Sequence, residues 1–194
     1  VQGSAFLSEG ISEYSAVALL AKEKGEKQLR KFLKYELDQY LEGRAFEQKY
    51  EPSIVQAEGQ SYIHYNKAGL TMYTLADFIG KDIFNRALGN FIEKYRYKSD
   101  PYPHIGQFIN SIRKETTQDL QYLITDTFEK ITLYENKAKS ASAILNRDST
   151  YTVDIEVEAK KVYSDSLGIQ SDGELSDWLE TVSYTHLTLP TMFE

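Results

Sequence analysis

The spacing of apolar residues changes near residue 130, and this change limits the possible folds more than any other feature of the chain. Before it, apolar side chains recur every three or four positions, as in Leu29, Leu33 and Leu37. After it, Tyr151, Val153, Ile155 and Val157 alternate with polar residues. The first spacing is typical of amphipathic helices and the second of strands with one buried face. We therefore expect a mainly α protein with a small β part.

Glycine and proline residues predict where the helices of the first part end. Lys24-Gly25-Glu26 separates two helices, and Gly80 closes the helix that contains Tyr65. Pro103 is expected in the first turn of the helix that follows, because its ring fixes φ and its missing N–H would have no helical partner there. In the later part, Asn146-Arg147-Asp148-Ser149 predicts a turn between two strands.

A carboxylate stands near the beginning of the first helix, in the stretch Phe6-Leu7-Ser8-Glu9-Gly10-Ile11-Ser12-Glu13-Tyr14. Helical spacing places Phe6, Ile11, Tyr14 and Leu19 on the inward face, and puts Glu9 and Glu13 one turn apart on another. The helix dipole alone favours an acidic residue in a first turn, so Glu9 has a structural explanation as well as a functional one. Two interpretations are open for Glu13: it lies on a solvated helix face, or it supports a metal ligand.

Two stretches together resemble a known family. The string Leu7-Ser8-Glu9-Gly10-Ile11-Ser12 is similar to the helix that carries the third zinc ligand in the aminopeptidase N family of zinc metallopeptidases, which are gluzincins. Tyr65-Asn66-Lys67-Ala68-Gly69 resembles the Y-x-K-G segment of that family, although Ala68 stands where a glycine usually follows the lysine. Weaker resemblance extends over most of residues 3–165.

The resemblance implies both a fold and an activity. Residues 1–130 would be the helical portion of a thermolysin-like peptidase catalytic domain, and 131–181 the start of a β-sandwich-like domain. Glu9 would bind one zinc ion, and the hydroxyl of Tyr65 would stabilise the oxyanion formed during hydrolysis of a peptide substrate. The two histidines of H-E-x-x-H, and the glutamate that binds a substrate amino group, lie upstream in the family. The chain is therefore expected to be an inactive fragment of a longer enzyme.

Composition and charge limit the alternatives. The formal net charge is −7 and the basic residues are spread along the predicted helices, which argues against a nucleic-acid partner. Without cysteine there are no disulfides or thiolate metal sites, and the compartment stays open. No apolar run is long enough to span a bilayer, so we expect no membrane contact from this segment. Family relatives leave open a parent that is membrane-associated or periplasmic.

Several interpretations remain open at this point. The three histidines, His64, His104 and His186, have no partner at helical spacing and fit structural or surface roles. A non-catalytic α-helical module that binds another protein, or a membrane-associated scaffold, would need neither Glu9 nor Tyr65. From Val182 to the end the pattern is lost abruptly, which suggests a non-native tail over 182–194.

Overall fold

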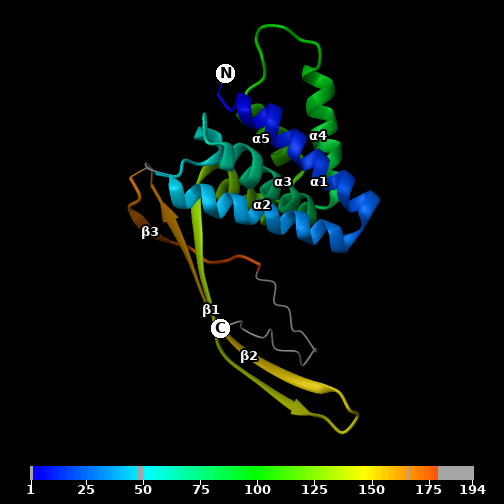
Figure 1. Cartoon of the computed structure of the whole chain (residues 1–194), viewed down its shortest axis with the longest axis vertical. Coiled ribbons are helices and arrows are strands. Elements are labelled where there is room, and N and C mark those ends of the chain that lie inside the picture. Colours follow the sequence, from blue (N-terminus) through cyan, green and yellow to red (C-terminus); the bar gives the residue numbers. More distant parts are fainter. Residues whose placement is uncertain (1, 48–49, 166, 179–194) are drawn as a thin grey trace.

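The computed structural model describes residues 2–47, 50–165 and 167–178. It consists of a compact group of helices from which a long β-hairpin projects (Figure 1). The α-helices are α1 (Ile11–Lys24), α2 (Glu26–Phe46), α3 (Ala68–Ile79), α4 (Lys81–Tyr95), α5 (Ile105–Glu115) and α6 (Gln121–Ile124). Short 3-10 turns are η2 (Ile54–Gln56) and η4 (Gln118–Leu120), and π-helical turns are η1 (Phe6–Gly10), η3 (Tyr62–Lys67) and η5 (Thr125–Glu129).

Glycine residues end two of the helices where the sequence predicts. Gly25 separates α1 from α2 with φ 73°, and Gly80 separates α3 from α4 with φ 99°. Both values lie in a region that side chains with a Cβ rarely adopt. The prediction for Pro103 is wrong, because α5 begins at Ile105 and His104 precedes it. The N–H of His104 donates to Oε1 of Gln107 at 3.0 Å, so this pair, and not the proline, defines the helix start.

Aromatic rings dominate the interior of the helical group. Phe108 is fully buried and packs against Phe6, Phe91 and Phe128, with ring centroids 5.2, 5.5 and 6.1 Å away. These rings come from η1, α4, α5 and η5, so one cluster ties the first helix to the last. The aliphatic core around them includes Ile63, Met72, Leu75, Ile105, Ile109, Ile112 and Ile124.

The β part is a three-stranded antiparallel sheet in the order β1-β2-β3. Its strands are β1 (Ile131–Leu145), β2 (Tyr151–Ser164) and β3 (Gln170–Gly173), and the turn at 146–149 joins the first two, as predicted. The coarse class, mainly α with a small β part, is confirmed. A register shift between Ala138 and Ser140 marks a β-bulge in β1.

The expectation that one face of the hairpin is buried is wrong for the residues described. Tyr151, Val153, Ile155 and Val157 project to one side of β2, yet their side chains are 42–64% exposed. The reason is that β3 pairs only with residues 161–164 of β2, and no second layer covers the far half of the hairpin in the part of the chain that the structure describes. The predicted 131–181 segment is described only as far as residue 178, with a gap at 166. The predicted tail, 182–194, lies outside the described residues.

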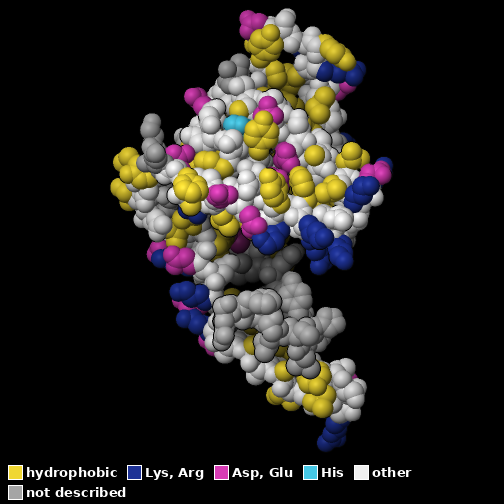
Figure 2. Space-filling model, in the orientation of Figure 1, with side chains coloured by type: hydrophobic (Ala, Val, Ile, Leu, Met, Phe, Trp, Pro, Cys, Tyr) yellow, Lys and Arg dark blue, Asp and Glu magenta, His cyan; other side chains and the backbone are white. Residues whose placement is uncertain are grey.

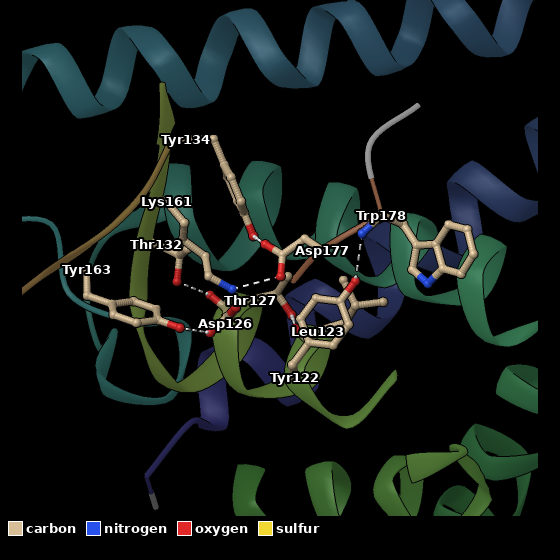
Figure 3. A network of polar contacts seen from close by, with 10 residues as sticks. All are labelled: Tyr122, Leu123, Asp126, Thr127, Thr132, Tyr134, Lys161, Tyr163, Asp177 and Trp178. Atoms are coloured by element: carbon tan, nitrogen blue, oxygen red, sulfur yellow. Dashed lines mark hydrogen bonds and ion pairs between the residues drawn. The ribbon is translucent and has the colours of Figure 1, made fainter. Parts of the chain in front are cut away.

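A buried ion cluster joins the sheet to the helices (Figure 3). The Nζ of Lys161 lies 2.8 Å from both Oδ2 of Asp126 in η5 and Oδ1 of Asp177, and the Lys161 side chain is 3% exposed. Tyr163 donates to Asp126 and Tyr134 donates to Asp177. Burial opposes the charged lysine, but its bonds with the two aspartates raise the pKa of Lys161 above its usual value. The lysine is therefore fully charged at neutral pH.

Basic side chains gather near the turn between α1 and α2 (Figure 2). The last turn of α1 contains Lys22 and Lys24, and α2 begins after Gly25 with Lys27, Arg30 and Lys31 in its first two turns. Among the described helices, none combines the length and apolar character needed to cross a membrane.

Candidate active site

Glu9 lies in the π-helical turn η1, which runs directly into α1. The N–H of Ile11 bonds to the carbonyl of Phe6, the five-residue spacing of a π turn. Such a turn inserts one extra residue into a helix and often occurs at functional sites. Phe6 and Gly10 point into the protein, and the side chain of Glu9 is half-buried.

Tyr65 lies in a second π-helical turn, η3, which runs into α3 in the same way. Its ring is 37% exposed and packs beside His64, with centroids 4.9 Å apart. The turn buries Tyr62 and Ile63 and leaves Tyr65 on the open side. The hydroxyl of Tyr65 is thus fixed near the surface, where a ligand could reach it.

The structure brings Glu9 and Tyr65 together, although the sequence separates them by two helices. The Glu9 carboxylate beside its hydroxyl is the main cause that raises the pKa of Tyr65, followed by burial and by the charge of Glu13. At neutral pH this tyrosine therefore keeps its proton and remains a hydrogen-bond donor.

Small residues allow η1 and α1 to approach the start of α3 closely. A Cβ at Gly10 would lie 2.9 Å from Cδ2 of Phe6 and 3.0 Å from Cβ of Ala68, and a Cβ at Gly69 would lie 2.8 Å from Cγ of Glu13. Ala68 and Gly69 therefore leave the room that this close approach needs. The residue that departs from the family pattern, Ala68, forms part of this contact.

Substitution of Gly10 tests the contact. Gly10→Ala should lower the free energy of unfolding by about 1–3 kcal/mol, because the methyl group has no space between two buried neighbours. Gly89→Ala is the matched control: no atom lies within 4 Å of its Cβ position in α4. That change should stabilise the protein by about 0.5–1 kcal/mol. Urea unfolding of both variants checks the prediction, and equal effects of the same sign would contradict it.

Two buried glutamates near Tyr65 were missed by the sequence interpretation. Glu36 of α2 is 4% exposed and accepts a hydrogen bond from Nδ2 of Asn66 at 2.8 Å. Glu51, in the segment after α2, forms an ion pair with Lys67. Glu36 falls at helical spacing between Leu29, Leu33 and Tyr40, and this position on an apolar stripe is a signal that could have revealed it. Glu51 has no such signal, because it lies in an irregular segment.

Among the remaining acidic and histidine candidates, Glu13 and His64 lie in the same region as Glu9 and Tyr65. Glu13 is half-buried, and burial followed by the charge of Glu36 raises the pKa of its carboxyl group. His64 faces the same region: burial lowers its pKa, the charge of Glu9 opposes this, and its Nδ1 has no hydrogen-bond partner among the described residues. His104 lies at the start of α5, away from this group, and His186 falls outside the described residues.

The described residues do not form a metal site by themselves. Among them, no group of three or more histidine, cysteine, aspartate or glutamate side chains could hold an ion. Glu9 offers one half-buried carboxylate, whose Oε1 lies 3.5 Å from Oγ of Ser8. A zinc site needs further nitrogen or oxygen ligands, so Glu9 fits the role of a single ligand and not of a complete site.

Comparison with known proteins gives no match for this chain to a family model, a curated protein or a solved structure.

Proposed function

We propose that this chain is part of a zinc-dependent metallopeptidase of the aminopeptidase type, in which Glu9 is a zinc ligand and Tyr65 stabilises the oxyanion. The observation that carries the proposal is the packing of η1 against η3, which places the Glu9 carboxylate beside Tyr65. The helical part would then belong to a thermolysin-like catalytic domain, and the sheet would begin a β-sandwich-like domain.

Each residue has a defined chemical task in this proposal. When bound, zinc lowers the pKa of a coordinated water and polarises the scissile carbonyl. The Glu9 carboxylate would contribute negative charge to the ligand set, together with two histidines of an H-E-x-x-H helix from outside this chain. The raised pKa of Tyr65 keeps its hydroxyl protonated, so it can donate a hydrogen bond to the carbonyl oxygen as negative charge develops there.

The test uses the full-length protein encoded by the source gene, with zinc content and hydrolysis of an aminoacyl anilide as readouts. Glu9→Ala should lose zinc and activity together. Tyr65→Phe should keep zinc but lower kcat by about 100-fold, because one oxyanion donor is removed. Tyr102→Phe is the control, since that ring is exposed on the segment between α4 and α5. The 194-residue chain alone should show no hydrolysis.

The second candidate is a module that binds another protein or a membrane surface and catalyses nothing. The exposed apolar face of the hairpin and the basic corner between α1 and α2 favour it. It predicts that neither Glu9→Ala nor Tyr65→Phe changes the zinc content or any hydrolysis by the full-length protein. That result would overturn the peptidase proposal.

A further inference from the structure

We propose that Glu51 and Glu36 are positioning residues for Tyr65, because they anchor Lys67 and Asn66, the two residues that directly follow it in η3. The inference rests on the proposed function in one respect only, namely that Tyr65 is a catalytic residue. The anchoring itself is a property of this chain and can be tested in the absence of zinc.

The first anchor is a buried ion pair. Nζ of Lys67 lies 2.5 Å from Oε1 of Glu51, and the two side chains are 16% and 6% exposed. Glu51 also accepts a hydrogen bond from the Tyr40 hydroxyl at 2.8 Å, and its Oε2 lies 2.8 Å from Nε of Arg44. A buried carboxylate is stable only with such partners. Because Tyr40 and Arg44 belong to α2, they fix Glu51, and Glu51 in turn fixes Lys67.

Lys67 has a second contact on the same side. Its Nζ lies 5.5 Å from the centre of the Tyr40 ring, in the geometry of a cation–π interaction. The ammonium group is therefore held by both a carboxylate and an aromatic ring of the α2 region. This leaves the end of η3 little freedom to move away from α2.

The second anchor is the hydrogen bond from Asn66 to Glu36. It joins the residue next to Tyr65 to the middle of α2, at a glutamate that is almost fully buried. Hydrogen bonds to charged groups contribute more than neutral ones, and Glu36 would lose a partner if Asn66 moved. Two consecutive residues of η3 are thus tied to two separate carboxylates.

Tyr65 itself lacks comparable support. Its ring is exposed, and its neighbours are His64 and the carboxylate of Glu9. The position of its hydroxyl therefore depends on the backbone of η3, which the two anchors hold. If either anchor is lost, we expect the hydroxyl to leave Glu9, because a small rotation of the turn displaces the end of a long side chain.

NMR of the 194-residue chain labelled with ¹³Cζ-tyrosine tests the anchoring. Tyr65→Phe identifies the Tyr65 resonance, and Glu9→Ala gives its position without the neighbouring carboxylate. Lys67→Met should move the resonance more than half of the way to the Glu9→Ala position, whereas Lys67→Arg, which keeps the charge, should restore it. Lys34→Met is the control, since that lysine is exposed on α2 and pairs with Asp38.

Asn66→Ala provides a second variant that leaves the ion pair intact, in case Lys67→Met fails to fold. It should move the Tyr65 resonance in the same direction. An unchanged resonance in folded Asn66→Ala and Lys67→Met variants would overturn the inference. In the full-length enzyme, both substitutions should lower kcat with little change in KM and with zinc retained. Loss of the peptidase proposal would leave the NMR result standing, so the two failures can be told apart.

Discussion

Replacement of Lys161 by methionine should lower the free energy of unfolding by about 3–5 kcal/mol. Methionine keeps most of the aliphatic stem but removes the ammonium group, which leaves Asp126 and Asp177 buried without their common partner. The folded-state pKa of Lys161 is raised above the unfolded value of about 10.4. The contribution of the lysine is therefore fully present at neutral pH, and is lost only as the pH rises through the raised pKa.

The neighbouring residue provides the control for this prediction. Lys160 also forms an ion pair, with Asp172, but its side chain is 50% exposed and faces water. Lys160→Met should leave the midpoint of urea unfolding almost unchanged, because solvent-exposed pairs contribute little. Similar losses in the two variants would show that the buried cluster has no special role in joining the sheet to the helices.

Replacement of Phe108 by alanine should have an effect of similar size, about 3–5 kcal/mol. The ring is fully buried and contacts aromatic rings from three other elements, so its removal leaves a cavity that no single side chain can fill. Because the cluster joins η1 to η5, we expect the loss to be seen equally by circular dichroism and by tryptophan fluorescence.

Ile92 of α4 offers a comparison for the core prediction. Its side chain is 45% exposed although it follows the buried Phe91. Ile92→Ala should cost much less than Phe108→Ala, since little apolar surface returns to water. If thermal unfolding placed both variants at the same midpoint, the aromatic cluster would not be the centre of the core.

The sequence predicted the helices well because their boundaries depend on local chemistry. Gly25 and Gly80 end helices through their own backbone freedom, and no tertiary contact is needed to recognise them. The residues at the edge of a helix's buried face were predicted less well. Leu19 was expected inside but is 59% exposed, since it lies about 140° around α1 from the buried Tyr14, at roughly 100° per residue.

The candidate site was predicted only in part, and the reason is physical. Glu9 and Tyr65 belong to short motifs that can be recognised locally. The π-helical turns that present them, and the buried Glu36 and Glu51 behind Tyr65, arise from packing between distant segments. Likewise, the segment from Gln118 to Glu129 divides into η4, α6 and η5, which brings Phe128 into the core and Asp126 to Lys161.

The bulge in β1 has a consequence for the lengths that this strand can have. Ala138 and Ala141 are three positions apart, yet they lie opposite Val157 and Ile155, which are two apart. The bulge takes up the additional residue, Lys139, so small apolar side chains of β1 stay on the same side as the apolar side chains of β2. Deletion of Lys139 would leave a regular ladder with the same faces, whereas a deletion elsewhere in β1 that leaves the bulge in place would turn part of the strand over. The number of residues in β1, and not only their type, is therefore part of the information that specifies the hairpin.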